Sequence, residues 1–163
     1  MSEDKTGSHG HEGRKATFEK TAGEPTRGLC RDKHEVLIDE PEWIPRMGGE
    51  DAHPSPVDYM MTALAACQVS VLSQCLSKAR IDDYNIKAEA TIDDAGEDDV
   101  DENMPDHTAN RIRHIDIQLH LEVPAEHEKR ASRCLEVYDT GCIVGQSYKA
   151  GIDYEPTTHL STK

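Results

Sequence analysis

One of the five cysteines of this chain, Cys67, lies inside a long segment without charge. From Tyr59 to Ser77 no residue carries a charge, although 31% of the whole chain is Asp, Glu, Lys or Arg. A thiol in such a segment either fills space in a core, where free cysteine is common, or acts as a nucleophile through its thiolate. The residue types alone favour a small buried residue over a nucleophile at Cys67.

The other thiols show no metal-binding or redox motif. The chain has no CxxC pair, so a zinc site or a thioredoxin-like motif has little support. The polar start of the sequence, Met1–Lys5, shows no secretory signal, so we expect reduced thiols rather than a disulfide framework. These thiols are Cys30, Cys75, Cys134 and Cys142.

Helical geometry separates two of these cysteines from the others. Cys75 follows Cys67 by eight residues and Cys134 precedes Cys142 by eight. Each offset is about 80° of rotation on an ideal helix, so the two members of each offset do not point the same way. We therefore predict that Cys75 and Cys134 fill the core, and that Cys30 is structural.

A helix start signal precedes the uncharged segment. Ser55, with Pro56 at the first helical position and Asp58 three residues after the serine, forms a capping box. The pattern predicts a helix from about Pro56 to Ala79. Because this helix is uncharged around its whole circumference, we expect it to be buried at the centre of the core.

Alternating and helical patterns surround this central helix. A strand over 15–21 and strand character over 29–39, separated by a turn at 23–26, predict an N-terminal β-meander. Half-buried strands are predicted at 86–92 and 115–123 because apolar residues alternate there. Two helices, from about 124 to 139 and over 142–149, and a last short strand with Ile152 and Tyr154 complete the order. The fold class is therefore α+β with an antiparallel sheet.

The length of 163 residues fits one domain, which we place at 15–163 after a disordered tail at 1–14. Residues 93–106 contain eight acidic residues and no basic one, which predicts an acidic loop insertion at 93–108. A calcium site is an alternative for this loop, but its spacing does not fit the EF-hand pattern.

The charge balance excludes several classes of partner. A net charge of −14 and a pI near 4.9 argue against nucleic-acid binding. The uncharged segment contains too many polar side chains for a membrane span, so we expect no membrane partner and a cytoplasmic location. Acidity over the whole length suggests a halophilic source, where salt screens self-repulsion.

Several short motifs together resemble the OsmC/Ohr family, the osmotically inducible and organic hydroperoxide resistance proteins. They are His34–Pro41, Gly48-Gly49, Pro54–Pro56, Ala63–Cys67 and, after a predicted helix, Gly141–Val144. Their order and spacing fit the family over about residues 15–157.

The resemblance implies an OsmC-like fold in which two subunits intertwine as a homodimer, with antiparallel sheets around long central helices. It also implies a thiol-dependent peroxidase that reduces organic hydroperoxides. Cys67 would be the peroxidatic thiol and Cys142 the resolving thiol. An external dithiol, such as a lipoyl protein, would reduce the resulting disulfide, and no metal or organic cofactor is implied.

The resemblance also implies two charged residues near the thiols, an arginine and a carboxylate, whose positions in this chain are not fixed by a motif. The resemblance implies an activating arginine from the N-terminal strands, for which Arg27 is the first candidate and Arg31 the second. It also implies a carboxylate directly after the helix-opening proline, where this chain has Val57. The acid comes one residue later, at Asp58, a rotation of about 100° on a helix.

The substitution at Val57 favours an alternative: an OsmC-like protein without peroxidase activity, a homodimer that binds a small molecule or acts in stress. A second alternative is another thiol enzyme, either a disulfide reductase or a hydrolase. Cysteine–histidine catalysis has one histidine near the helix start, His53, and it precedes the cap.

Overall fold

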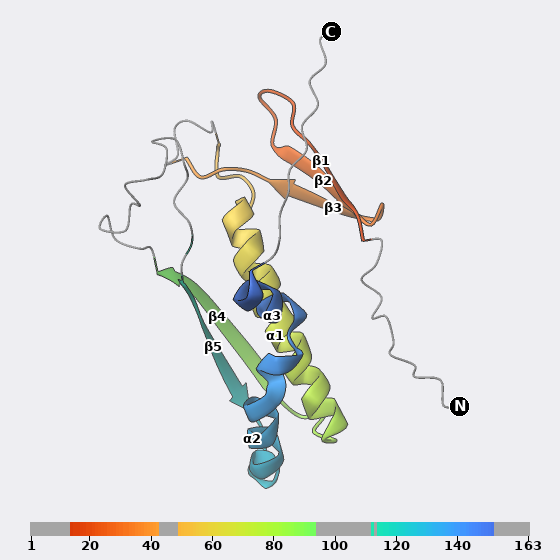
Figure 1. Cartoon of the computed structure of the whole chain (residues 1–163), viewed down its shortest axis with the longest axis vertical. Coiled ribbons are helices and arrows are strands. Elements are labelled where there is room, and N and C mark those ends of the chain that lie inside the picture. The colour runs from red at the N-terminus through yellow and green to blue at the C-terminus, as the bar shows by residue number, and fades with distance from the viewer. Residues whose placement is uncertain (1–13, 43–48, 94–111, 113, 152–163) are drawn as a thin grey trace. The chain divides into compact units, whose positions relative to one another are not determined.

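The computed structural model describes residues 14–42, 49–93, 112 and 114–151. The chain divides into two compact units, Met1–Tyr59 and Met60–Lys163, each with its own antiparallel sheet (Figure 1). The α+β class predicted from the sequence is confirmed. The predicted strand at Ile152 and Tyr154 and nearly all of the acidic insertion lie outside the described residues.

The sheet of the first unit is an antiparallel meander, as predicted, but it has three strands in the order β1-β2-β3 where the sequence predicted two. Gly28 faces Phe18 across the first pair of strands, and a β-carbon on Gly28 would lie within 2.1 Å of the Phe18 ring. The glycine therefore makes room for the aromatic ring. The strands are β1 (Ala16–Glu19), β2 (Thr26–Cys30) and β3 (His34–Ile38).

The predicted single strand over 29–39 is wrong in its continuity. Arg31 and Asp32 adopt positive φ angles of 55° and 52°, and the chain turns there between β2 and β3. Left-handed backbone is uncommon for residues other than glycine. Because neither position holds the glycine or asparagine that commonly marks such a turn, the sequence did not reveal the break between the two strands.

After β3, one carboxylate organises the segment that leads to the central helix. Asp39 accepts hydrogen bonds from the backbone N–H groups of Glu40, Glu50 and Ala52, at 2.9, 3.0 and 3.2 Å. These bonds lower the pKa of Asp39. Gly49 allows this closure, because a β-carbon there would collide with the backbone oxygen of Glu40.

The central helix α1 (Pro56–Lys78) begins at the predicted capping box. The Ser55 backbone N–H and hydroxyl both donate to Asp58 Oδ2 at 2.8 Å, and the Asp58 backbone N–H donates to Ser55 Oγ at 3.3 Å. Two backbone donors at the start of α1 are satisfied in this way. Asp58 therefore has a structural role at this helix start.

The second unit packs a two-stranded sheet and two further helices against α1. Strand β4 pairs with β5 from Asn85 opposite Glu122 to Asp93 opposite His114. The predicted strands and helices are confirmed, with boundaries shifted by one or a few residues. The elements are β4 (Asn85–Asp93), β5 (His114–Glu122), α2 (Glu128–Val137) and α3 (Ile143–Ala150), with 3₁₀ turns η2 (Ala125–His127) and η3 (Tyr138–Gly141).

The core of the second unit forms along one stripe of α1. The buried residues of the helix lie four apart, and Leu72 and Leu76 join a fully enclosed cluster with parts of α2. The expectation that α1 is buried all round is wrong, since Thr62, Ala66 and Ser70 are exposed. The other described elements of this unit cover a single side of the helix. The buried residues of the stripe are Leu64, Gln68, Leu72 and Leu76.

By length and composition, α1 is the one helix in the described part of the chain that could cross a membrane. The core helix of a soluble protein passes the same test, so a single such helix is weak evidence.

Candidate functional site

The two thiols singled out in the sequence lie together in the second unit. Cys67 is half-buried on α1, and Cys142 is fully buried at the residue that caps the start of α3. Burial raises the pKa of Cys142, and its interaction with the neighbouring Cys67 thiol raises that pKa further. A protonated, enclosed thiol therefore stands beside a more accessible one.

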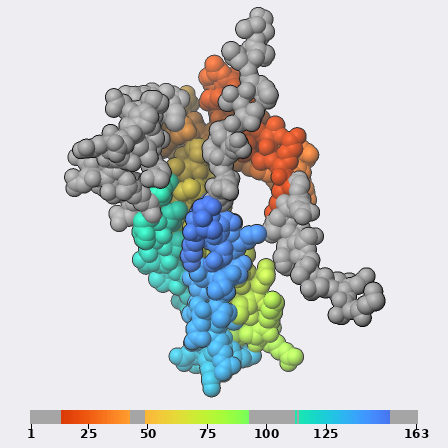
Figure 2. Space-filling model, in the orientation of Figure 1, coloured from red at the N-terminus to blue at the C-terminus, as the bar shows by residue number. Residues whose placement is uncertain are grey.

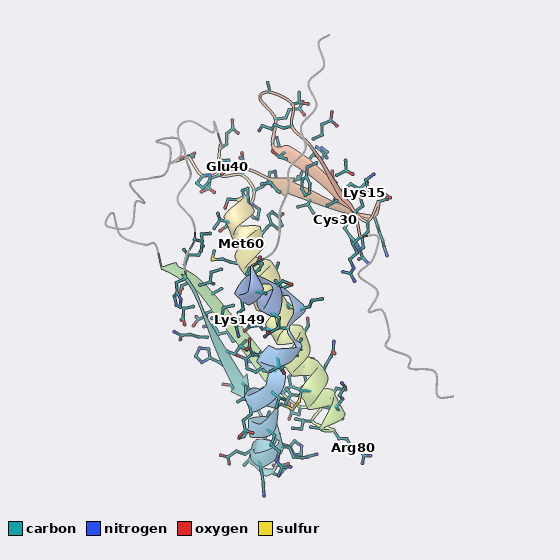
Figure 3. The ribbon with its side chains drawn as sticks, viewed as in Figure 1. Lys15, Cys30, Glu40, Met60, Arg80 and Lys149 are labelled. Carbon is teal, nitrogen blue, oxygen red and sulfur yellow. A yellow bond between two sulfur atoms is a disulfide. The ribbon has the colours of Figure 1, made fainter. Side chains whose placement is uncertain are left out.

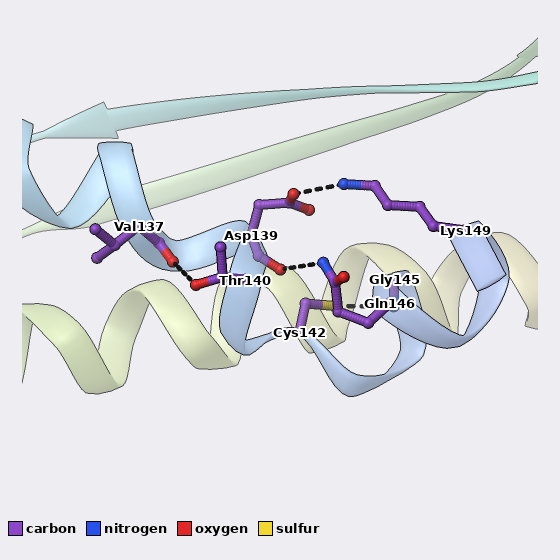
Figure 4. A network of polar contacts seen from close by, with 7 residues as sticks. All are labelled: Val137, Asp139, Thr140, Cys142, Gly145, Gln146 and Lys149. Carbon is purple, nitrogen blue, oxygen red and sulfur yellow. Dashed lines mark hydrogen bonds and ion pairs between the residues drawn. The ribbon is translucent and has the colours of Figure 1, made fainter.

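The start of α3 is built closely around the Cys142 sulfur. The Gly145 backbone N–H donates to Cys142 Sγ at 3.2 Å (Figure 4). This bond favours the thiolate and partly opposes the effect of burial on the pKa of Cys142. A β-carbon on Gly145 would lie 3.2 Å from that sulfur and 3.5 Å from Leu64 of α1, so a larger residue would crowd the site.

The turn before Cys142 is fixed by Asp139. Its carbonyl accepts from the Cys142 backbone N–H at 3.2 Å and from Gln146 Nε2 at 3.0 Å. Its carboxylate binds Lys149 Nζ at 2.5 Å (Figure 4). All these contacts lie within η3 and α3, so they set the shape of this segment but do not fasten it to α1.

A cavity of about 610 Å³ lies within the second unit, and its wall includes Gly145 of α3 and Leu64 and Gln68 of α1 but neither Cys67 nor Cys142. Strand β5 and helix α3, which both contribute to its wall, stand side by side on one face of this unit (Figure 2). Leu64 and Gly145 line the cavity and also approach the Cys142 sulfur. The wall combines aliphatic side chains with polar groups at Gln68, His114, Tyr138, Asp139, Tyr148 and Lys149.

Gln68, the residue after Cys67, is a functional candidate that sequence reasoning did not single out. Its side chain is 8% exposed, and its Oε1 atom is buried without a hydrogen-bond partner among the described residues. A buried carbonyl without a donor is costly. One sequence feature could have indicated Gln68: it is a polar residue four positions after Leu64, where the helical spacing predicts a buried apolar side chain.

The arginine candidates lie in the first unit, whereas the thiols lie in the second. Arg27 of β2 forms an exposed ion pair with Glu35 of β3. Arg31 follows β2 and contacts His34 Nε2 at 2.9 Å. The activating role of either arginine stays a prediction.

The expectation of reduced thiols is wrong for one pair. Cys75 of α1 and Cys134 of α2 form a disulfide with 5.6 Å between their Cα atoms. The predicted core position of Cys134 is confirmed, since that residue is 2% exposed. Cys30, Cys67 and Cys142 are free; Figure 3 labels Cys30 on β2.

The predicted rotations compared Cys75 with Cys67 along α1 and Cys134 with Cys142 along the returning segment, so they carried no information on whether Cys75 of α1 faces Cys134 of α2. A disulfide requires that the two cysteines lie at the same level on facing helices.

The described residues contain no group of three or more His, Cys, Asp or Glu side chains that could hold a metal ion.

Comparison of the chain with known proteins identifies its family. A family model described as OsmC-like protein matches residues 48–157. No protein with a curated description matches the chain.

Solved structures with the same fold cover most of the chain. An OsmC-like protein from Mycoplasma pneumoniae is 11% identical with a TM-score of 0.60, over 85% of this chain and 89% of that one. An organic hydroperoxide resistance protein OsmC from Legionella pneumophila is 14% identical with a TM-score of 0.56, over 86% of this chain and 91% of that one. The organic hydroperoxide resistance protein OhrB of Bacillus subtilis is 15% identical with a TM-score of 0.52, over 86% of this chain and 93% of that one.

These structural matches show the OsmC-like α+β fold, with its antiparallel sheets and long central helix. The family model spans more than half of the 163 residues and includes both free thiols of the second unit. The chain therefore belongs to the OsmC-like protein family.

Proposed function

We propose that this protein is a thiol-dependent peroxidase that reduces organic hydroperoxides through Cys67 and Cys142. The observation that carries the proposal is the pairing of a half-buried thiol with a fully buried one beside a cavity. The Cys67 and Cys142 thiols are close enough to form a hydrogen bond with each other, and neighbouring thiols of this kind can be oxidised to a disulfide when their geometry allows it.

Cys67 carries the first step because it is the more accessible thiol of the pair. Its thiolate attacks the terminal oxygen of the hydroperoxide, an S–O bond forms, and the O–O bond breaks. The alkoxide takes a proton and leaves as an alcohol, and Cys67 becomes a sulfenic acid. Since burial keeps a proton on Cys142 at neutral pH, the Cys142 S–H can donate a hydrogen bond to a negatively charged Cys67 sulfur.

Cys142 carries the second step. Its sulfur attacks the Cys67 sulfenic sulfur, a disulfide forms, and water leaves with the hydroxyl and the Cys142 proton. The Gly145 N–H, which already contacts Cys142 Sγ, favours the thiolate that must develop during this attack. An external dithiol, such as a lipoyl protein, then returns both cysteines to thiols by exchange.

The cavity supports an organic rather than an inorganic peroxide. Its volume of about 610 Å³ far exceeds what hydrogen peroxide needs, and Met60, Leu64, Ile115 and Ile117 offer aliphatic contact to a hydrocarbon chain. The substrate class we propose is therefore a small organic hydroperoxide.

The remaining family features complete the proposal. Arg27, or Arg31 as the alternative, would activate Cys67. Two copies of the chain would form a homodimer, which is supported by the uncharged yet exposed positions on α1, including Thr62, Ala66 and Ser70. We propose a cytoplasmic location, where dithiol reductants are available.

One observation favours a second candidate, an OsmC-like homodimer that binds a small molecule or acts in stress without peroxidase activity. Val57 occupies the position at which the family resemblance implies a carboxylate, and its side chain is 41% exposed. Asp58, the next residue, is occupied by the capping box with Ser55. In this candidate function the cavity alone would be the functional site.

Consumption of cumene hydroperoxide with dithiothreitol as reductant distinguishes the two functions. The wild type should consume peroxide, and Cys67→Ser should fall to the rate without protein. Cys142→Ser should lose activity during turnover as the unresolved Cys67 becomes sulfinic acid. Cys30→Ser, which removes a free thiol of the first unit, is the matched control and should match the wild type. Equal slow rates for wild type and Cys67→Ser would exclude the peroxidase.

A further inference from the structure

The second pair of cysteines has no role in the chemistry described above. The Cys75–Cys134 disulfide joins α1 to α2 inside the buried cluster of the second unit. Cys134 is enclosed and Cys75 is half-buried, so the bond lies within packed side chains.

The two cysteine pairs have the same antiparallel register. Cys75 lies eight residues after Cys67 on α1, and Cys134 lies eight residues before Cys142 on the returning segment. Eight residues of α-helix span about 12 Å, so the disulfide is too far from Cys67 for direct exchange. The bond therefore cannot take part in the reaction itself, but it fixes the alignment of the segment that carries Cys142.

Few other bonds fasten that segment to α1. Among the described residues, side-chain hydrogen bonds reach the α1 region from Arg130 to the Ala79 carbonyl at 2.5 Å and from Tyr148 to the Met60 carbonyl at 3.4 Å. Both donors are exposed, and the second bond is long. Between them, Gly141 and Gly145 let the backbone approach Val71 and Leu64 closely, but these are packing contacts.

We propose that the Cys75–Cys134 disulfide is a positioning element that holds Cys142 against Cys67 and so speeds resolution of the Cys67 sulfenic acid. This role rests on the proposed function, because resolution matters only if Cys67 is oxidised by a peroxide. Without the bond, α2 and η3 shift more freely against α1, and Cys142 reaches Cys67 less often. The sulfenic acid then persists, and a second hydroperoxide converts it to sulfinic acid while releasing a second alcohol.

The test measures the closeness of Cys67 and Cys142 without peroxide. In a glutathione redox buffer, Cys67 forms a mixed disulfide with glutathione. Cys142 then attacks the Cys67 sulfur, the bond to glutathione breaks, and the products are the protein disulfide and free glutathione. The ratio of the protein disulfide to the mixed disulfide, multiplied by the concentration of free glutathione, gives the effective concentration of Cys142 at Cys67. We expect this concentration to fall by about tenfold or more in Cys75→Ala/Cys134→Ala, since small misplacements of a reacting group are costly.

Two controls separate the bond from the packing of its side chains. Cys75→Val/Cys134→Ala restores most of the lost volume without the bond, and it should show the same fall. Recovery of the wild-type value in this variant would assign the effect to packing and overturn the proposal. Cys30→Ser, in the first unit, should leave the effective concentration unchanged.

Two further outcomes would also overturn the positioning role. The first is an unchanged effective concentration in Cys75→Ala/Cys134→Ala. The second is peptide mapping of the purified wild type that shows free thiols at Cys75 and Cys134. A parallel assay uses Cys142→Ser, in which the resolving thiol is absent, and traps the Cys67 sulfenic acid with dimedone after one equivalent of cumene hydroperoxide. Failure to form this adduct would refute the peroxidase function, while the glutathione measurement would still decide whether the disulfide positions Cys142.

Discussion

Reduction of the Cys75–Cys134 bond should cause a large loss of stability. The bond closes a loop across a sequence separation of 59 residues. In the chain-entropy model a loop of this length lowers the entropy of the unfolded state by about 14 cal/mol/K, which corresponds to about 4 kcal/mol at 25 °C. This exceeds the contribution of most single side-chain contacts.

Urea unfolding of a Cys67→Ser variant measures this contribution directly. The substitution prevents a bond between Cys67 and Cys142, so the oxidised and reduced samples differ at Cys75 and Cys134. With a urea dependence of about 2 kcal/mol/M, the midpoint should fall by about 2 M on reduction. Protein concentration must be equal in both samples, because association would stabilise each of them by mass action.

A midpoint shift of less than about 0.5 M, or about 1 kcal/mol, would refute this reasoning. It would mean that the unfolded chain gains little freedom when the bond opens. A fall in the slope of the transition on reduction would instead show that the reduced protein no longer unfolds in one step.

Three further predictions concern single residues. Gln68→Met should stabilise the protein by about 1 kcal/mol, because it removes a buried carbonyl without a donor; destabilisation in thermal unfolding would show that a donor reaches Gln68. Ser55→Ala should lower the free energy of unfolding in urea by about 1 kcal/mol through loss of the cap, whereas Val57→Ala at the exposed neighbouring position should have a smaller effect. Titration of Cys142, followed by the ¹³Cβ chemical shift, should have a higher midpoint in the folded protein than in the urea-unfolded protein, because burial raises the pKa of this thiol. The unfolded thiol loses its proton first, so stability should fall once the pH passes the ordinary pKa of a cysteine thiol; a folded midpoint at or below the unfolded one would contradict the effect of burial.

The parts of the fold that were predicted correctly have local signals. The cap of α1 depends on Ser55 and Asp58, which are three residues apart and need nothing distant to form their bonds. The alternation along 115–123 similarly predicted β5, because a period of two is set by the backbone of a strand. The turn at Arg31 and Asp32 has a weaker signal, since aspartate is found at positive φ more often than most residues but arginine is not.

The features that the sequence did not predict depend on pairs of distant elements. No spacing within α1 reveals that Cys75 faces Cys134, because that contact depends on how α2 returns along the helix. The exposure of Ala66 and Ser70 depends likewise on which side of α1 the rest of the chain covers. The pairing of Cys67 with Cys142 was accessible through the family resemblance, which carries information about distant contacts that periodicity lacks.

The shared register of the two cysteine pairs has a practical consequence for proteomics. Trypsin leaves one segment, 47–78, with a cysteine from each pair, and a second segment, 134–149, with their partners. Native and crossed pairings therefore give tryptic products of identical mass, and a standard digest cannot tell a Cys67–Cys142 bond from a scrambled one. Cleavage after Leu72 and Glu136, by chymotrypsin and a glutamyl endopeptidase, separates the cysteines within each segment and makes every disulfide assignment unambiguous.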